Sequence, residues 1–537
     1  MQSPSRVVAL VLNSVTRDSR VCKEADGLAG DGHEVTVIGL VDKTDSRVND
    51  VRDSGARIRR IELSGWMVQR RYRRHANVSL LVTAGLVAGL FVIVFFSFGL
   101  SLDAIVGGVI DRIGVSGAIL SVMIGALAIW SARRSIRYRS FARKKASALR
   151  PGTPHSEPVF DRDHVIGSVM RFLSGAAARG RFEVSGVLRV LKRIRANDLY
   201  LSRFLPELAR LAPDVVHCHD LPTLPVGAEW CRRHSSVKLV FDSHELYEEV
   251  ASLSSPERWY WRRKLRRLSG NVDAFITVNE SIAAEHARRY PALPRAVVVR
   301  NAAVRPSSDP ESRGLLRAAA KVRDDQRVLL YQGGYARHRG LEALLFASVE
   351  LPPEWVVVMM GWGAHEARLR TIALDVDPLG DRIRFLPPAA PEVLRDWTAG
   401  ADLGVIPYEN TCLNHWFCSP NKLWEYPVAG VPILASPFPE LRREIEGAGI
   451  GCLLPEVLDG PGLRRVVDSI DDEALMRMRA ACREYARRDH WGVYLERLLG
   501  LYRRLDSAPN RVCKAEVKPA AAVMMDPMPS PAEGGAG

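Results

Sequence analysis

The sequence lacks several features that would assign a chemistry at once. Its eight cysteines are scattered among 537 residues, with no CxxC pair and no spacing of metal ligands, so we expect free thiols and no metal site. No signal peptide is recognised, because the short apolar run from Val7 to Leu12 follows no basic region and precedes no cleavage site. We interpret that run as a first β-strand.

Two binding motifs are also missing. No GxGxxG turn follows the first predicted strand, so a dinucleotide-dependent oxidoreductase is not supported. No DxD motif stands at a strand end to hold a metal ion, and we expect no cofactor. The formal net charge of +14 raises the alternative of nucleic acid binding, but the basic clusters flank apolar runs and lack interleaved aromatic residues. Membrane lipids are the predicted anionic partner, and nucleic acid is not.

The sequence contains two long apolar runs. Residues 78–102 and 113–132 contain no charged side chain, and a helix of 25 residues exceeds the roughly 30 Å of a bilayer core. Basic clusters lie on both outer flanks, at 70–74 and 133–145, and not in the loop between. The positive-inside rule therefore predicts a transmembrane hairpin in the inner membrane with both ends in the cytoplasm. A buried core hairpin is the alternative.

The rest of the chain alternates apolar strands with helical segments, which indicates an α/β fold with parallel sheets. The strands predicted in the first half are 7–12, 35–38, 56–63, 215–217, 239–241, 274–278 and a strand ending at Asn301. Those predicted in the second half are 328–331, 355–360, 383–386, 403–406 and 431–435. Residues 165–212 are expected to form several helices, which would lie on the membrane or cap a sheet.

These patterns divide the chain into two Rossmann-like domains with a membrane insertion in the first. The predicted segments are 1–65 (N-terminal domain, first part), 66–145 (hairpin with basic flanks), 146–194 (linker and helical segment), 195–305 (N-terminal domain, second part), 306–506 (C-terminal domain) and 507–537 (disordered tail). Ligands of such sheets bind at the carboxyl ends of the strands.

The stretch SPNKLWEYPVAGVPILASPFPE, residues 419–440, suits phosphate and sugar recognition. Asn421 and Lys422 open a short helix that carries Glu425, and Gly430 ends it. Helix N-terminal N–H groups and a lysine favour an anion, and a carboxylate one turn later can accept bonds from a ribose diol. An ordinary capped helix is the alternative.

A second loop predicted to hold an anion follows the strand at 328–331 and reads QGGYARHRGLE. Gly333 and Gly334 permit close backbone approach, and Arg337 and Arg339 can neutralise charge. Together the two loops fit a nucleotide diphosphate sugar as donor and co-substrate, because cations can hold the departing diphosphate without a metal.

The chain resembles the retaining GT-B glycosyltransferases of family 4, also called glycosyltransferase group 1. The resemblance covers residues 1–65 and about 195–505. It rests on the joint order of RDSRVCKEADGLAGDGHEVTVI, PDVVHCHDLPTLPVG, FDSHELYEE, ITVNESIA, VVVRNAA, YQGGYARHRGLEALL, GWGAHEARLR, ADLGVIPYENT and SPNKLWEYPVAGVPILAS.

Roles follow from the resemblance residue by residue. It implies that Glu425 binds the donor ribose, that Arg339 and Lys422 contact the diphosphate, and that His219 lies close to the donor sugar; these last three would be catalytic. Gly333, Gly334, Arg337 and Asn421 complete the donor loops, and Asp242, His244 and Glu245 would line the acceptor side. His217 next to His219 leaves an HxH metal site open, although no third ligand is placed.

The chain departs from the family pattern at two positions. Phe417 stands where the first glutamate of the E-x7-E motif is usual, and Asn414 or Asn421 would have to replace it. Gly334 stands where an arginine is usual, and Arg337 would reach in instead. The function implied is transfer of a sugar, with retention, to a lipid-linked acceptor in polysaccharide or glycolipid assembly. The alternatives are a non-catalytic membrane scaffold and an enzyme with a soluble acceptor.

Overall fold

The computed structural model describes residues 4–16, 18–42, 45–63, 162–305 and 314–507. Both predicted membrane segments, 78–102 and 113–132, lie outside these residues, as does the predicted tail apart from Ser507, which ends a helix. Within the ranges described, none of the helices combines the length and apolar character needed to cross a membrane. By its contacts the chain divides into two units, residues 1–62 with 190–537 and residues 63–189. The elements below belong to the first unit, except for the beginning of α4.

The first sheet has the strand order β3-β4-β2-β1-β5-β6-β7-β8 and is parallel apart from β3, which runs antiparallel to β4. Its strands are β1 Arg6–Leu10, β2 Glu34–Leu40, β3 Asn49–Val51, β4 Arg57–Ile61, β5 Val215–His219, β6 Lys238–Ser243, β7 Ala274–Thr277 and β8 Val297–Val298. The predicted strands are confirmed, and only the three-residue β3 has no counterpart among them. Nearly continuous burial along β1, β5 and β6 explains why apolar runs identified them.

The helices of this sheet are α1 Ser19–Gly30, α5 Leu224–Arg233, α6 Ser255–Leu268 and α7 Glu280–Arg289, with the 3-10 turns η2 Tyr247–Glu249 and η3 Ser269–Asn271. Side chains fix where two of them begin. The Asp18 carboxylate accepts from the backbone N–H of Val21 at the start of α1. Ser254 and Glu257 form a capping box at the start of α6.

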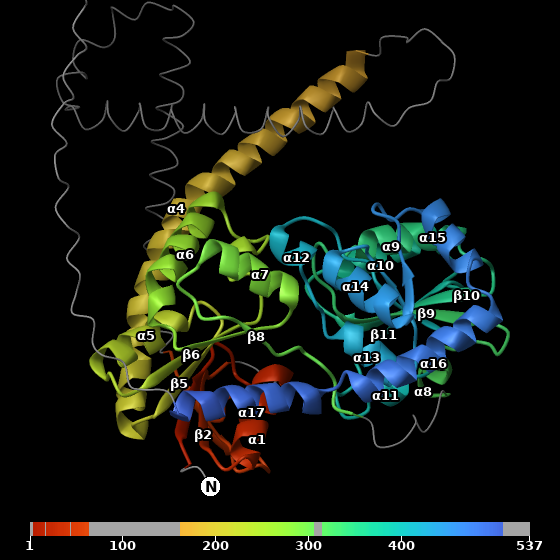
Figure 1. Cartoon of the computed structure of the whole chain (residues 1–537). Helices are drawn as coiled ribbons and strands as arrows, with labels where there is room; N and C mark the ends of the chain where they lie inside the picture. Colours follow the sequence, from red (N-terminus) through yellow and green to blue (C-terminus); the bar gives the residue numbers. More distant parts are fainter. Residues whose placement is uncertain (1–3, 17, 43–44, 64–161, 306–313, 508–537) are drawn as a thin grey trace, which may run out of the picture. The chain divides into compact units, whose positions relative to one another are not determined.

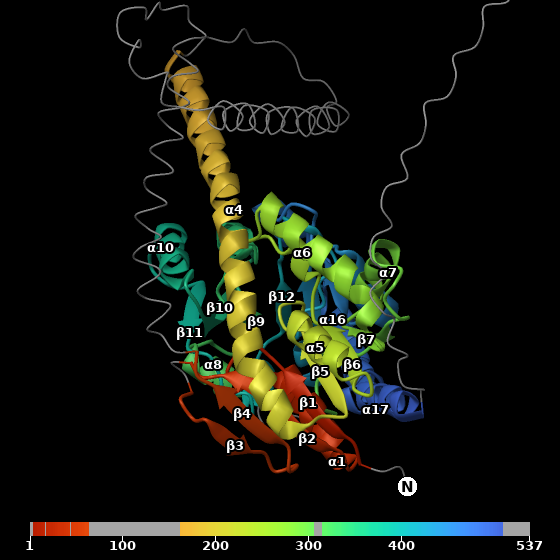
Figure 2. The same ribbon diagram turned by 90° about the vertical axis from the view of Figure 1, so that its left-hand side faces the viewer.

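A single helix, α4 Arg162–Leu211, replaces the several helices predicted between 165 and 212. It runs through Pro206 and also through the predicted domain boundary at 194/195. Its C-terminal part packs on the first sheet with Phe204 and Leu208, which are 1% and 0% exposed. Nearer the middle of α4, Arg193 donates to Glu257 of α6, and Figure 2 shows the two helices next to each other there.

The second sheet is wholly parallel, with the order β11-β10-β9-β12-β13-β14. Its strands are β9 Arg327–Gly334, β10 Trp355–Trp362, β11 Ile383–Leu386, β12 Leu403–Ile406, β13 Ile433–Ala435 and β14 Gly451–Leu453. Its helices are α8 Gly314–Ala319, α9 Leu341–Ala347, η4 Ser348–Glu350, α10 Glu366–Val376, α11 Leu394–Thr398, α12 Leu413–Trp416, α13 Lys422–Val428, α14 Pro439–Ala448, α15 Gly460–Asp468 and α16 Asp472–Arg488. The second Rossmann-like sheet is therefore confirmed.

The last helix, α17 Trp491–Ser507, returns from the second sheet to the first. Figure 1 shows it beside α1, and a Cβ atom added at Gly27 of α1 would lie 2.2 Å from Leu495 of α17. The prediction placed these residues in the C-terminal domain, yet Leu498 and Tyr502 are buried against N-terminal elements. The chain therefore passes between the sheets twice, once between β8 and α8 and again between α16 and α17.

Candidate active site

The carboxyl ends of β5 and β6 bring three predicted residues together. His217 and His219 point from β5, and Asp242 of β6 is paired in register with His219. All three are at most 2% exposed. His219 Nδ1 lies 3.5 Å from the Asp242 carboxylate and 3.1 Å from His244 Nε2. The predicted neighbourhood of His219, Asp242 and His244 is thus a contiguous set of polar side chains.

A buried arginine that the sequence analysis did not select organises this set. Arg20, the second residue of α1, donates from Nε and Nη2 to both oxygens of Asp242, at 3.0 and 2.9 Å. Its Nη1 donates to the backbone carbonyl of Val299 at 2.6 Å. Glu24, on the next turn of α1, forms an ion pair with Arg20 at 3.0 Å. Paired in this way, the charges of the cluster largely balance inside the protein.

The pKa values follow from burial and from these neighbours. Burial alone would raise the pKa of Asp242, but Arg20 and then His244 hold it well below its usual range. Burial would lower the pKa of His244, yet the carboxylates of Asp220 and Asp242 raise it to about 9. His217 behaves differently, because burial and the charge of His219 lower its pKa well below the usual value. At neutral pH the cluster contains a charged His244 and a neutral His217.

Tyr502 of α17 completes the cluster from the far end of the chain. Its hydroxyl lies 2.8 Å from His217 Nδ1, and the His217 ring stacks on His219 with centroids 4.3 Å apart. The returning helix therefore holds one imidazole of the site in place.

Four of these side chains, Glu24, His217, His219 and Asp242, offer ligand atoms within 4.8 Å of one another. Glu24 and Asp242 are thus the further candidate ligands that a metal site at His217 and His219 would need. However, the two imidazole rings are stacked at only 19° to one another, and their in-plane lone pairs do not converge on one point. Arg20 also occupies both carboxylates. The arrangement suits a hydrogen-bonded ion network better than a metal ion.

Two of the residues predicted on the acceptor side, His244 and Glu245, lie on the loop after β6, whereas Asp242 belongs to the strand. The backbone N–H of His244 donates to Asp220 at 3.1 Å, and Asp220 has the left-handed φ of 62°. Glu245 accepts from Asn414 Nδ2 at 2.8 Å, and Asn414 Oδ1 accepts from the backbone of Leu246 at 2.9 Å. Asn414 thus joins this loop to the second sheet. Both ends of its amide are used there, so it is a poor replacement for the missing glutamate.

The two loops predicted to bind the donor meet at the carboxyl end of β9. Gly333 has φ 113°, and a Cβ atom there would lie 2.9 Å from Lys422 Nζ. Lys422 is 8% exposed; its Nζ lies 5.1 Å from the ring centroid of Tyr331 and 3.5 Å from the Tyr408 hydroxyl. The half-buried guanidinium of Arg339 lies 4.2 Å from the centroid of the Tyr408 ring.

Lys422 and Arg339 share a lack of acidic partners in the part of the chain that the structure describes. Across the described ranges, no carboxylate lies within ion-pair distance of Lys422 or Arg339. A nearly buried ammonium that faces aromatic rings and a glycine is costly unless an anion joins it. The glycine, the lysine and the arginine together form a site that an anionic group would stabilise.

Glu425 is held on the next turn after Lys422. Its carboxylate accepts from Gln332 Nε2 at 2.8 Å, and Gln332 Oε1 accepts from Thr398 Oγ1 at 2.7 Å. This chain of hydrogen bonds orients the carboxylate at the end of β9. Gln332 directly precedes the glycine pair, whose backbone drew the attention in that loop. Thr398 lies on a different helix, α11, and nothing in the sequence links it to Glu425.

Other predicted residues take different positions. Gly334, Arg337 and Asn421 are exposed, and the Asn421 side chain does not cap α13. Phe417 packs with Leu246, Val278 and Ile282, and its carbonyl accepts from Asn279 Nδ2 at 2.7 Å. The position of the missing glutamate is therefore an apolar contact between elements of the two sheets.

Comparison with known proteins is consistent with this geometry. The family model described as Glycosyltransferase Family 4 matches residues 153–303. A D-inositol 3-phosphate glycosyltransferase from Mycolicibacterium smegmatis is 25% identical over 407 residues, which cover 72% of this chain and 86% of that protein. Another of the same name from a Nocardioides species is 27% identical over 54% of this chain and 67% of that protein.

Solved structures give the fold. Sucrose-phosphate synthase from Thermosynechococcus elongatus aligns with a TM-score of 0.60 at 15% identity, over 94% of this chain and all of that one. A glycosyltransferase from Rickettsia africae aligns with a TM-score of 0.51 at 9% identity, over 94% of this chain and 99% of that one. The protein is a glycosyltransferase. Its two parallel sheets have the GT-B arrangement that the resemblance implied.

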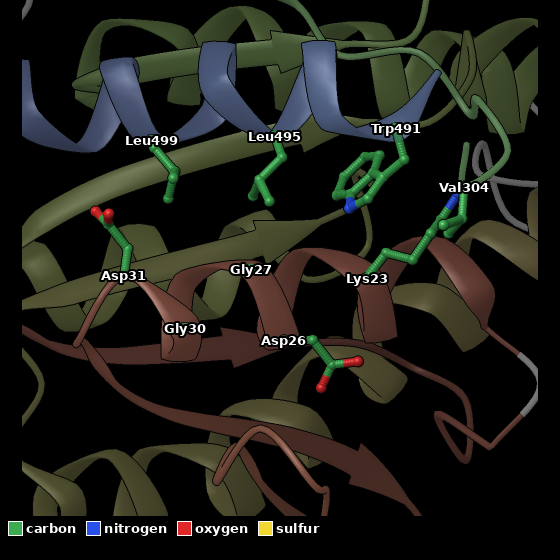
Figure 3. Close-up of a pocket in the computed structure, with 9 residues that line it drawn as sticks. All are labelled: Lys23, Asp26, Gly27, Gly30, Asp31, Val304, Trp491, Leu495 and Leu499. Carbon is green, nitrogen blue, oxygen red and sulfur yellow. The ribbon is translucent and has the colours of Figure 1, made fainter. Parts of the chain in front are cut away.

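The glycosyltransferase also has a pocket away from these side chains. It has a volume of about 520 Å³ and lies between α1 and α17 (Figure 3). Its lining consists of Lys23, Asp26, Gly27, Gly30, Asp31, Val304, Trp491, Leu495 and Leu499. None of the predicted site residues lines it, so it is not the site described above.

Lys23, at one end of that pocket, contacts both segments that connect the two sheets, the one after β8 and the one that ends at the start of α17. Its Nζ donates to the carbonyl of Ala302 at 2.7 Å and lies 4.8 Å from the Trp491 ring centroid. The backbone N–H of Trp491 in turn donates to Ala303 at 2.7 Å. Burial, with Arg20 second, lowers the pKa of Lys23 to about 8. Lys23 and Trp491 thus tie α1 and the start of α17 to the segment after β8.

Proposed function

We propose that the glycosyltransferase takes its sugar from a nucleoside diphosphate sugar, with the diphosphate bound by Lys422, Arg339 and the backbone at Gly333. The observation that carries this proposal is the pair of cations without acidic partners beside a left-handed glycine. Glu425, oriented by Gln332, would accept hydrogen bonds from the ribose hydroxyls. In this proposal the two cations balance the diphosphate charge, so no metal is required.

The proposed reaction retains the anomeric configuration. The bond between the anomeric carbon and the diphosphate oxygen breaks, and an acceptor hydroxyl bonds to that carbon from the same face. The proton of the hydroxyl passes to the leaving phosphate oxygen. Lys422 and Arg339 stabilise the charge that develops on that oxygen, and His219 orients the donor sugar.

The proposed acceptor is lipid-linked. This rests on the two uncharged runs, 78–102 and 113–132, whose basic flanks would place both soluble parts on the cytoplasmic side of the inner membrane. The acceptor would then approach from the side of Asp242, His244 and Glu245. The relatives named above act on D-inositol 3-phosphate, so a soluble acceptor is the competing candidate.

Donor turnover by the purified full-length protein in lipid nanodiscs tests this function. UDP, GDP and ADP sugars are offered in turn with membrane lipid extract or inositol phosphate as acceptor. We expect one nucleotide to be released, and the product to show which acceptor is used and whether configuration is retained. Lys422→Ala and Glu425→Ala should each lower kcat/KM by about 100-fold, as losses of transition-state contacts commonly do.

Arg477→Ala, which removes an exposed charge of α16 far along the chain, is the matched control and should leave turnover unchanged. Donor binding without release of nucleotide, with every acceptor offered, would favour the non-catalytic scaffold. Phe417 at the position of the usual first glutamate is the feature that keeps this alternative open.

A further inference from the structure

Helix α6 has an unusual composition for a helix on a globular surface. Its sequence SPERWYWRRKLRRL contains six basic residues, three aromatic residues and one acidic residue. Glu257, Trp261 and Leu265 form its buried side. The opposite side carries the four exposed residues Trp259, Arg263, Arg266 and Arg267, which we call the α6 face. Trp259 is 62% exposed, although a tryptophan normally buries most of its ring.

Among the residues that the structure describes, no acidic side chain neutralises the arginines of the α6 face. Arg258 and Arg262, at its border, form ion pairs with Glu249. By contrast, the part of the chain that the structure describes places no carboxylate within ion-pair distance of Arg263, Arg266 or Arg267. The Arg263 guanidinium lies 5.7 Å from the Trp259 ring centroid instead. An exposed indole therefore lies among three arginines that have no acidic partner within the described ranges.

The exposure of Trp259 does not come from a loosely held helix. Glu257 closes the capping box with Ser254 and also accepts from Arg193 Nε of α4 at 2.9 Å. The Arg193 guanidinium lies 5.8 Å from the Trp261 ring centroid on the buried side. Figures 1 and 2 show α4 and α6 next to each other. The α6 face is consequently a fixed surface.

The α6 face is also connected to the acceptor side of the site. His244 and Glu245 are followed by η2, and α6 begins six residues after the end of η2. The Tyr247 ring of η2 lies 5.3 Å from the Trp261 ring, edge to face, and Arg193 donates to its hydroxyl at 3.4 Å. These contacts are made by the buried side of α6, so a bilayer bound to the opposite α6 face would lie about one helix diameter, roughly 10 Å, from η2 and the loop before it.

We propose that the α6 face docks on an anionic lipid bilayer and so presents the acceptor loop to the headgroup region. An indole ring favours the interface between headgroups and acyl chains, and arginines favour anionic headgroups. One exposed tryptophan without further stacking rings fits a nucleic acid less well. The inference rests on the proposed membrane association, but it concerns a surface of the folded body and not the uncharged runs.

Hydrogen–deuterium exchange of residues 255–268 in the full-length protein tests the docking. The protein is reconstituted in nanodiscs of phosphatidylcholine alone or with phosphatidylglycerol, and is also measured in detergent without a bilayer. We expect exchange in α6 to slow several-fold only when phosphatidylglycerol is present, and the slowing to disappear at high salt because the attraction is electrostatic.

Protection of α6 should be lost in a triple variant that combines Arg263→Gln, Arg266→Gln and Arg267→Gln. With each arginine near an anionic surface contributing roughly fivefold, the docking equilibrium should weaken by about 100-fold. The KM for a lipid-linked acceptor should rise, whereas the KM for the donor should not change. The control variant Arg464→Gln, Arg477→Gln, Arg487→Gln removes the same charge from exposed positions on α15 and α16 and should retain protection.

Equal exchange of α6 in all three environments would overturn the docking. So would full protection without lipid, because another part of the chain or a second copy would then cover the α6 face, and so would loss of protection in the control variant. The exchange measurement does not depend on turnover. If no donor is consumed while α6 is protected by anionic lipid, the proposed function fails and the docking stands.

Discussion

At the scale of single residues, His244 gives the clearest dependence on pH. Its pKa of about 9 in the folded protein exceeds the ordinary value of 6.5, because Asp220 and Asp242 outweigh burial. A raised folded pKa means that the stabilisation is complete below about pH 6.5 and is lost as pH rises through 9. Urea unfolding of the wild type and His244→Gln should therefore differ by about 3 kcal/mol more at pH 6 than at pH 10. An equal difference at both pH values would contradict this.

Tyr502 is a second residue whose role can be separated from general stability. Tyr502→Phe removes the hydroxyl 2.8 Å from His217 Nδ1 and leaves that nitrogen buried without a partner, at a cost of about 1–3 kcal/mol. Because His217 stacks on His219, we expect kcat to fall several-fold with the donor KM unchanged. Tyr494→Phe, on the same helix and bonded to Asp489, is the control. It should lose stability but not kcat, and equal effects on kcat would refute a positioning role for Tyr502.

At the scale of elements, the loop between β9 and α9 depends on one glycine. Gly340 has φ 68°, and a Cβ atom there would lie 1.6 Å from the carbonyl oxygen of Pro407. Gly340→Ala should therefore cost about 3 kcal/mol or more of unfolding free energy, from backbone strain and displacement of the loop. Gly380→Ala has the same φ but meets no atom within 4 Å, and should cost about 1 kcal/mol. Denaturant unfolding of both variants measures the difference.

At the scale of the whole molecule, the open prediction is integral membrane insertion through residues 78–102 and 113–132. We expect the protein to remain in the membrane pellet after alkaline carbonate extraction. Leu90→Arg with Ile93→Arg places two charges at the centre of the first run, where each costs about 3 kcal/mol of insertion energy. The variant should move to the supernatant, whereas Leu379→Arg, at an exposed position of the folded body, should not. A wild type that is extracted by carbonate would exclude the hairpin.

The sequence by itself determined most of the elements. Strands such as β11 and β12 were predicted with their observed bounds, because a buried parallel strand is a short apolar run between polar turns. The same local reading places Lys422 and Glu425 on a helix that begins at Lys422 and leaves Gly333 and Arg339 in the loop after β9. The strands β3 and β14 are not fully buried, and so they show no apolar run of the kind that identified the equally short β13.

Tertiary structure alone decided which distant residues meet. Arg20 and Asp242 are 222 positions apart, and nothing in the local sequence distinguishes Arg20 from an exposed helical arginine. The return of α17 to the first sheet, and with it Tyr502 at His217, likewise follows from long-range packing and not from periodicity. Asn414 was considered as a sugar ligand, but folding places it against Glu245. Local patterns report burial along one segment, whereas a site is assembled by loop closure and by the register of strands far apart in the chain.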